Sequence, residues 1–244
     1  MMTTEMRSRA TVGVLGGMGP EATLDFMARV LRATPAASEQ DHLRLLVDSD
    51  PSMPDRHAAI AGRTPSIGPR LAAMAAGLER AGADFLVMPC NTAHAFQADI
   101  EASVGIPFVG MIDLVVDALQ SLGASRVGLM AASGCLEAGI YQRALSVAGV
   151  QPLVWTTADV AAFMALLYRI KSGERSASLR EQLTALAVRL EAAGAEVLVV
   201  ACTEIPLVLA DHDCSVQLLS ATDLLATETV RRALGPDLSN SVSP

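Results

Sequence analysis

Short apolar runs alternate with longer amphipathic segments along the chain of 244 residues. The short runs are rich in valine and leucine and predict buried parallel strands, whereas the longer segments have apolar residues at helical spacing. The predicted strands cover residues 11–15, 43–47, 85–88, 106–109, 152–155, 197–200 and 215–219, and a further strand begins at 126. The predicted helices cover residues 24–31, 69–80, 92–102, 113–122, 137–148, 159–171, 179–193 and 222–234. This alternation is typical of an α/β fold with parallel sheets and right-handed crossovers.

The second half of the chain repeats the pattern of the first. Residues 78–84 (Leu-Glu-Arg-Ala-Gly-Ala-Asp) lead to Cys90, and residues 190–196 (Leu-Glu-Ala-Ala-Gly-Ala-Glu) lead to Cys202. In both copies a glycine stands eight residues before the cysteine, and the strand between them is almost wholly apolar. We therefore expect two pseudo-symmetric parallel-sheet α/β domains, with the active site in the cleft between them.

Composition narrows the class of protein. The chain is 51% hydrophobic but only 3% aromatic, and its net charge is -8 with a pI near 5.0. This acidic balance argues against a nucleic-acid surface, and no apolar run is long enough to span a membrane. Residues 1–10 do not resemble a secretory signal. The four cysteines lack C-x-x-C spacing and neighbouring histidines, which predicts a cytoplasmic protein with free thiols and no bound metal.

Cys90 and Cys202 each follow a predicted strand and precede polar residues suited to starting a helix. Free N–H groups at such a helix start favour the thiolate. Two cysteines in one cleft are compatible with a disulfide, a metal site or an acid–base pair, and no further ligands stand at metal-binding spacing. The acid–base pair fits best, because two opposed thiols can remove a proton from one face of a stereocentre and return a proton to the other.

Other candidate residues lie in loops and near helix ends. The glycine-rich turn at residues 16–20 brings backbone N–H groups close to a small carboxylate. Arg56 either clamps a carboxylate or pairs with a neighbouring aspartate at the surface. Lys171, the only lysine, is either a solvated residue near a helix end or the Schiff-base lysine that a pyridoxal phosphate (PLP) enzyme would need. His57 and His94 are acid–base groups by type, but nothing in the sequence pairs them with the cysteines.

Four segments in family order resemble the aspartate/glutamate racemase family, and most closely its cofactor-independent aspartate racemases. These segments are Gly16-Gly17-Met18-Gly19-Pro20, Pro54-Asp55-Arg56, Met88-Pro89-Cys90-Asn91-Thr92-Ala93-His94 and Cys202-Thr203-Glu204. The resemblance covers essentially the whole chain, and the two cysteine segments together are its specific part. It implies an isomerase, without PLP or another cofactor, that racemises a small acidic amino acid and is commonly a homodimer.

The same resemblance implies roles for individual residues. Cys90 and Cys202 would be the catalytic pair, each the base for one enantiomer of aspartate. The implied substrate-binding residues are Gly17, Met18, Asn91, Thr92, Ser133, Thr203 and Glu204, with Arg56 and Lys171 for the side-chain carboxylate. Relatives usually carry glycine before the second cysteine, where this chain has Ala201. The family's chain path returns the last helix to the first domain, which predicts domains 1–113 plus 220–244 and 114–219.

Two other classes of function stay open at this point. The first is a sister activity of the same superfamily: glutamate, broad-range amino-acid or hydantoin racemisation, or isomerisation of a small dicarboxylate. The second is a ligand-binding or redox-sensing protein that keeps the cleft without the catalysis. The sequence does not give the length of the pocket, which decides between aspartate and glutamate.

Overall fold

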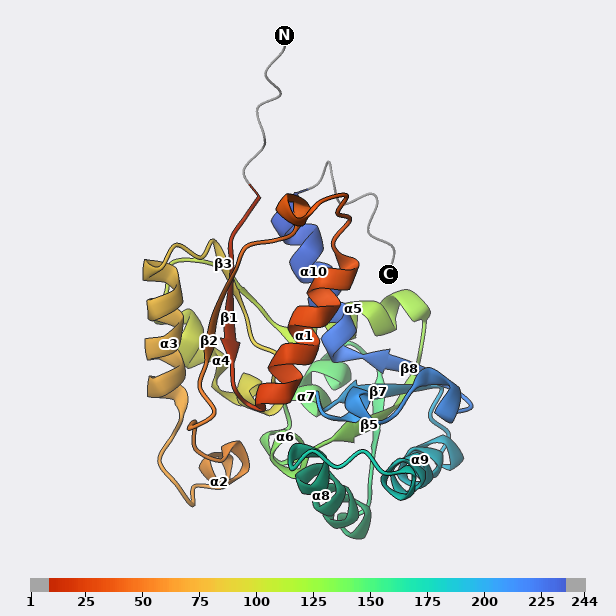
Figure 1. Cartoon of the computed structure of the whole chain (residues 1–244). Helices are drawn as coiled ribbons and strands as arrows, with labels where there is room; N and C mark the ends of the chain where they lie inside the picture. The colour runs from red at the N-terminus through yellow and green to blue at the C-terminus, as the bar shows by residue number, and fades with distance from the viewer. Residues whose placement is uncertain (1–8, 236–244) are drawn as a thin grey trace.

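The computed structural model describes residues 9–235 as two four-stranded parallel sheets with flanking helices (Figure 1). The first sheet has the order β2-β1-β3-β4, from β1 (Val12–Gly16), β2 (Leu45–Ser49), β3 (Phe85–Val87) and β4 (Phe108–Val109). The second has the order β6-β5-β7-β8, from β5 (Arg126–Ala131), β6 (Gln151–Val154), β7 (Val197–Ala201) and β8 (Gln217–Ser220). The predicted α/β class and its two parallel sheets are therefore confirmed.

The helices follow the strands in both halves. The first half holds α1 (Pro20–Ala33), α2 (Arg56–Ile60), α3 (Gly68–Arg80), α4 (Gln97–Glu101) and α5 (Met111–Leu122). The second half holds α6 (Ser133–Ala138), α7 (Ile140–Val147), α8 (Thr157–Lys171), α9 (Ala177–Ala192) and finally α10 (Ala221–Leu234). Short 3₁₀ helices are η1 (Glu39–Asp41), η2 (Thr92–Phe96), η3 (Ile205–Leu207) and η4 (Asp211–Asp213). Among these described helices, none is both long and apolar enough to cross a membrane.

Three predicted segments differ from the structure. The predicted helix 92–102 is η2 followed by α4. The predicted helix 137–148 starts earlier and is divided into α6 and α7 by Gly139, whose φ of 63° is left-handed. The segment interpreted as a loop up to residue 57 instead starts α2, because the Asp55 carboxylate caps that helix by accepting the Ala58 N–H.

The sequence repeat has a packing reason. Gly13 and Gly128 stand at equivalent positions in β1 and β5, each next to the end of a helix. A Cβ atom on Gly13 would lie 3.3 Å from Leu78 Cβ of α3, and one on Gly128 would lie 2.9 Å from Leu190 Cβ of α9. The glycines that follow α3 and α9 have φ values of 93° and 94°, which turn the chain into the next strand. The repeated segments therefore seat the same helix end on the same strand in both halves.

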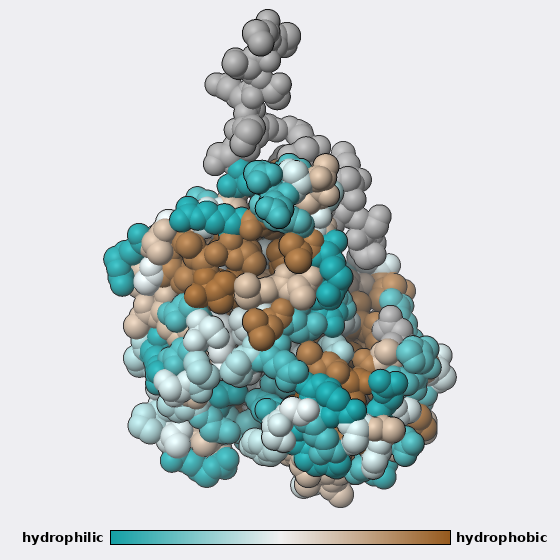
Figure 2. Space-filling model, viewed as in Figure 1, coloured by the Kyte–Doolittle hydropathy of each residue, from teal (hydrophilic) through white to brown (hydrophobic). Residues whose placement is uncertain are grey.

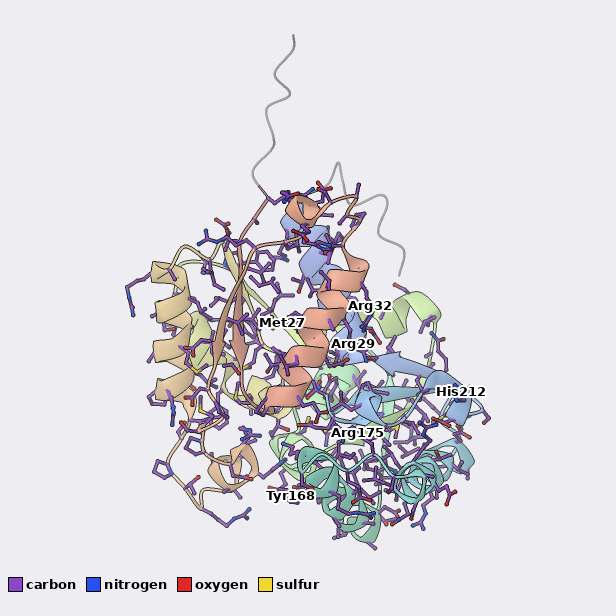
Figure 3. All side chains as sticks on the ribbon, in the orientation of Figure 1. Met27, Arg29, Arg32, Tyr168, Arg175 and His212 are labelled. Atoms are coloured by element: carbon purple, nitrogen blue, oxygen red, sulfur yellow. The ribbon has the colours of Figure 1, made fainter. Side chains whose placement is uncertain are left out.

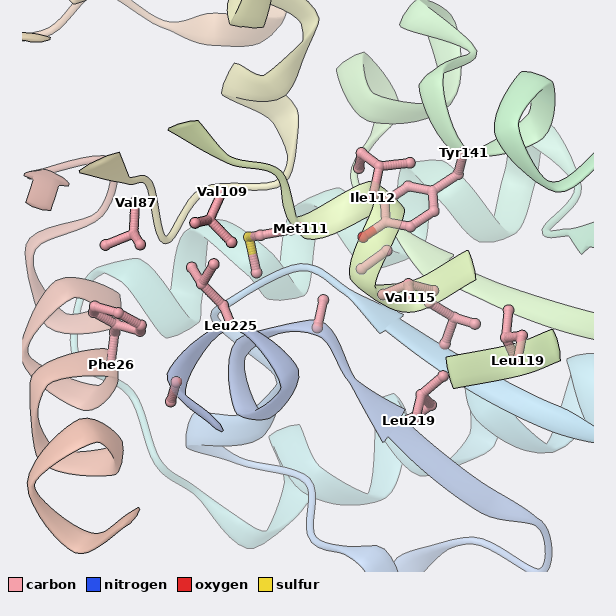
Figure 4. Packing of buried hydrophobic residues seen from close by; sticks show 14 of the residues in the cluster. Phe26, Val87, Val109, Met111, Ile112, Val115, Leu119, Tyr141, Leu219 and Leu225 are labelled. Carbon is pink, nitrogen blue, oxygen red and sulfur yellow. The ribbon is translucent and has the colours of Figure 1, made fainter. Parts of the chain in front are cut away.

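One hydrophobic core joins the two sheets. Figure 4 shows Phe26 and Val87 of the first half and Tyr141 and Leu219 of the second within one buried cluster. Helix α10 also packs against both α1 and α5. Separate clusters cover the outer faces, under α3 in the first half and under α8 and α9 in the second. The domain boundaries 1–113 plus 220–244 and 114–219 stay a prediction, and residues 1–8 and 236–244 lie outside the described part.

Candidate active site

The first cysteine sits in a turn that a histidine anchors. Cys90 follows β3, and its carbonyl oxygen lies 2.9 Å from His94 Nδ1. The Met111 N–H donates to His94 Nε2 at 3.0 Å, so Nδ1 carries the ring proton and donates to the Cys90 carbonyl. Burial lowers the pKa of His94 to about 4, and the ring is neutral. His94 is thus a structural support of the turn rather than an acid–base group.

The second cysteine sits in a more polar turn after β7. Its thiol lies 3.2 Å from Glu204 Oε2, which also accepts the Thr203 hydroxyl at 3.2 Å. Lys171 Nζ of α8 lies 3.2 Å from Glu204 Oε1, an ion pair without close hydrogen-bond alignment. Burial raises the pKa of Cys202, and the Glu204 carboxylate adds to that shift. Cys202 is therefore a protonated thiol that is hydrogen-bonded to the Glu204 carboxylate.

Both cysteines line one narrow pocket between the two halves. Its volume is about 10 Å³, which is room for about one water molecule. The lining residues are Met18, Arg56, His57, Cys90, Asn91, Thr92, Ala132, Leu167, Lys171, Cys202, Thr203 and Glu204. Nine of the eleven candidate residues from the sequence are therefore in the lining. An amino acid needs several times this volume, so the cleft must widen to admit one.

The two remaining candidates lie outside this lining. The Gly17 N–H already donates to the Thr23 hydroxyl at 2.9 Å, and the φ of Gly17 is 90°. A Cβ atom at this position would lie 2.4 Å from the Asp50 backbone, so only glycine fits here. Ser133 is the first residue of α6, and its N–H lies 3.4 Å from Met164 Sδ. The roles of Gly17 and Ser133 in substrate binding stay predictions.

Two cations face the pocket in different states. The Arg56 guanidinium donates to the Pro54 carbonyl at 3.3 Å and has no ion-pair partner among the described side chains. Lys171, in contrast, is already paired with Glu204. Burial has the largest effect and lowers the pKa of the Lys171 ammonium, but the Glu204 carboxylate together with Cys202 and Cys90 makes the net shift upward. Lys171 is therefore held protonated, a poor state for forming a Schiff base.

His57 is a lining residue that links the two halves. Its Nδ1 accepts the Gly134 N–H of α6 at 3.0 Å, and burial lowers its pKa. A Cβ atom on Gly134 would lie 2.6 Å from that nitrogen, so glycine permits the contact. The sequence marks His57 by type and by its place beside Arg56, but not as part of the lining.

The side-chain amide of Asn91 has its oxygen held by a hydrogen bond and its nitrogen without a partner. Tyr141, buried in α7, donates its hydroxyl proton to Asn91 Oδ1 at 2.6 Å. Asn91 Nδ2 is buried without a hydrogen-bond partner, which leaves a donor available to a ligand. Sequence reasoning missed Tyr141, because an aromatic residue on a helix fifty positions away looks like ordinary core. Alternating polar and apolar positions carry no signal for such a contact.

Two further observations concern thiol and metal chemistry. Burial raises the pKa of Cys135 to about 12, with a smaller contribution from Cys90, so this thiol stays protonated at neutral pH. No disulfide joins any of the four cysteines. Within residues 9–235, no group of three or more His, Cys, Asp or Glu residues is placed to hold a metal ion.

The halves also meet through an ion pair outside the lining of this pocket. Arg175, in the loop after α8, lies below the N-terminal end of α1 in Figure 3. Its guanidinium is 2.6 Å from the Glu21 carboxylate of α1. This ion pair, the Gly134–His57 hydrogen bond and the Tyr141–Asn91 hydrogen bond are thus three polar contacts between the halves.

The fold and the sequence define the class of protein. The profile of the Asp/Glu/Hydantoin racemase family matches residues 15–229. The chain belongs to this family, whose racemases are isomerases.

Individual relatives cover nearly the whole chain. The structure of the Picrophilus torridus aspartate racemase superposes with a TM-score of 0.83 at 27% identity, over 92% of this chain and 94% of that one. The broad specificity amino-acid racemase RacX of Bacillus subtilis is 23% identical, over 90% of this chain and 96% of its own length. Glutamate racemase isoform RacE1 of Bacillus anthracis has a TM-score of 0.64 at 19% identity, over 91% of this chain and 80% of that one, which shows a shared fold.

Proposed function

We propose that the protein is a PLP-independent racemase that interconverts L- and D-aspartate, with Cys90 and Cys202 as its two proton-transfer groups. One observation carries this proposal: two cysteines from equivalent strand ends of two similar halves line one pocket together with two cations. Opposed thiols suit proton transfer on both faces of one carbon atom, and the cations suit a substrate with two carboxylates.

In the proposed reaction, a thiolate removes the proton from Cα while the opposite thiol delivers a proton to the other face. The product then leaves with the two cysteines in exchanged protonation states, so the opposite enantiomer uses the other cysteine as base. No atom is gained or lost. Closure of the narrow pocket excludes water, which strengthens the interactions of the charged groups with the substrate.

Substrate binding follows from the polar groups that line the pocket. Asn91 Nδ2 and the hydroxyls of Thr92 and Thr203 suit the α-carboxylate and ammonium groups, together with the backbone near Met18. Arg56 has no ion-pair partner among the described side chains, so it is the first anchor for the side-chain carboxylate. Lys171 is shared between that carboxylate and Glu204.

The direct test is the conversion of L-aspartate, followed by chiral separation of the product. We expect D-aspartate to accumulate towards a racemic mixture, and Arg56→Gln to lower kcat/KM for aspartate by about tenfold or more, the value of a charged hydrogen bond. A matched control is Arg63→Gln, an exposed arginine outside the pocket lining. The absence of both D-aspartate and deuterium uptake at Cα would overturn the proposal.

A second candidate is a racemase of broad amino-acid range. The similarity to RacX over nearly the full length of both chains favours it. A panel of L-glutamate, L-asparagine and L-alanine beside L-aspartate separates the two. Aspartate specificity predicts that loss of the side-chain carboxylate abolishes turnover, whereas a broad-range enzyme would retain it.

We also propose a cytoplasmic homodimer. Four cysteines without a disulfide suit a reducing compartment. On α1, the exposed Leu24 and Leu31 join Leu43 and Leu45 in an apolar hollow of about 320 Å³, part of the apolar surface seen in Figure 2. Such a surface suits contact with a second copy. Light scattering of wild type and Leu24→Glu tests this, and a monomeric wild type would contradict it.

A further inference from the structure

Glu204 has more partners than a substrate-binding carboxylate needs. It is 5% exposed, and its two oxygens face the Cys202 thiol, the Thr203 hydroxyl and the Lys171 ammonium. All three contacts are at 3.2 Å. In the absence of substrate, Glu204 therefore already forms an ion pair with Lys171, the cation that a substrate carboxylate would contact.

The hydrogen bond from Cys202 fixes where a proton must reside. An ionised carboxylate only accepts hydrogen bonds, so the Cys202 S–H must donate to Glu204 Oε2. Ionising Cys202 would remove that bond and place two anions 3.2 Å apart in a buried site. The reverse distribution, with a neutral Glu204 and a Cys202 thiolate, is disfavoured because Lys171 stabilises the carboxylate.

Cys90 lacks this constraint. Within the described part of the chain no hydrogen bond involves Cys90 Sγ, and this residue forms its hydrogen bonds through its backbone. Lys171 also acts electrostatically on both cysteines. The charged and titratable groups that line the same pocket as Cys202 are Arg56, His57, Cys90, Lys171 and Glu204.

We propose that Glu204 is a positioning residue that keeps Cys202 protonated in the substrate-free protein, so that Cys202 enters the first turnover as the proton donor. Cys90 then removes the first proton from the enantiomer whose Cα–H faces it, and Cys202 donates. When Cys202 acts as base in the reverse direction, Glu204 must accept the same S–H again once Cys202 is reprotonated. This assignment of roles rests on the proposed function, whereas the resting protonation of the thiols does not.

Other groups near Cys202 act in both directions. Burial raises its pKa most, followed by the Glu204 carboxylate, whereas Lys171 and the Glu204 backbone N–H lower it. Removing the negative charge of Glu204 while keeping its shape should therefore leave Lys171 as the dominant charge and favour the thiolate.

The test is a titration of thiolate ultraviolet absorbance in Cys90→Ala, with and without Glu204→Gln. We expect Glu204→Gln to move the titration of Cys202 down by about one to three pH units. Glu204→Asp should restore part of the shift, because its charge is kept at a greater distance. The matched control is Glu174→Gln, which removes a carboxylate paired with Arg169 outside the pocket and should leave the titration unchanged.

Cys135 and Cys214 are present in all of these variants and cancel in the difference. An unchanged or upward-shifted Cys202 titration in Glu204→Gln would overturn the inference. Absence of racemase activity together with the expected titrations would overturn only the proposed function.

Discussion

The two halves of the molecule share a scaffold but surround their cysteines differently. Both sheets have the same strand order, and a cysteine follows the third strand of each half. Cys202 donates to the Glu204 carboxylate, whereas Cys90 has its carbonyl oxygen bonded to His94 and its sulfur free of hydrogen bonds within the described residues. Four residues after each cysteine stand His94 in one half and Pro206 in the other. A repeated fold thus supplies two thiols to one pocket, and the local residues give each cysteine different hydrogen-bond partners.

The largest expected effect concerns His94, which has no counterpart in the second half. Its folded-state pKa is about 4, against 6.5 in the unfolded chain, because burial disfavours the charged ring. The unfolded chain therefore takes up a proton first, and stability present above about pH 6.5 falls towards pH 4 by roughly 3 kcal/mol. Urea unfolding across this range measures the slope.

His94→Gln should flatten this slope, although it lowers stability at every pH by removing two hydrogen bonds. The matched control is His212→Gln, since His212 is exposed and lies outside the pocket lining. An unchanged slope in His94→Gln would contradict the structural role of the neutral ring.

The next effect tests the equivalence of the two scaffolds. Alanine at Gly13 or at Gly128 would place a Cβ atom 2.6 Å from a leucine methyl group of the neighbouring strand. Each change should lower the free energy of unfolding by about 1–3 kcal/mol, and by similar amounts. Gly77→Ala in α3 would place a Cβ atom 4.0 Å from the Arg80 guanidinium, an ordinary contact, and should stabilise by about 0.5–1 kcal/mol. A large loss of unfolding free energy in only one of Gly13→Ala and Gly128→Ala would contradict the equivalence of the two scaffolds.

A smaller effect concerns a bond between the halves. Tyr141→Phe removes the hydroxyl that orients the Asn91 amide. We expect KM for aspartate to rise about three- to tenfold with little change in kcat, as for the loss of one neutral hydrogen bond. Tyr168→Phe, at an exposed position of α8, is the control. A fall in kcat with unchanged KM would instead place Tyr141 in the proton transfer.

The smallest effect concerns the ion pair between Glu21 and Arg175. Both side chains are partly exposed, so Glu21→Gln should cost less than about 1 kcal/mol. The difference from wild type should shrink as salt is added, because salt screens exposed charges. Urea unfolding at low and high ionic strength measures it. A salt-independent loss would indicate a packing contribution instead.

Much of the scaffold is readable from the sequence. Apolar runs before Cys90 and Cys202 predict the third strand of each half, and the repeated segments before them predict two similar halves. Polar residues after each cysteine predict a candidate site at the strand ends. These features depend on residues that are close together in the sequence, so they can be predicted without knowledge of the tertiary structure.

Other features leave no trace in the hydrophobic pattern. Two of them are local: the division of α6 from α7 at Gly139 and the capping of α2 by Asp55. The Tyr141–Asn91 bond and the Lys171–Glu204 ion pair join residues far apart in the chain. No pattern of spacing encodes them, and they determine which donors in the pocket are free.

The most direct test of two opposed proton-transfer groups is racemisation in D₂O. Wild type should convert L-aspartate to D-aspartate that carries deuterium at Cα, and start equally well from D-aspartate. Cys90→Ala and Cys202→Ala should each lose racemisation in both directions, by about a hundredfold or more, while Cys214→Ala keeps it. Full racemisation by either pocket variant would contradict the assignment of one proton-transfer group to each half.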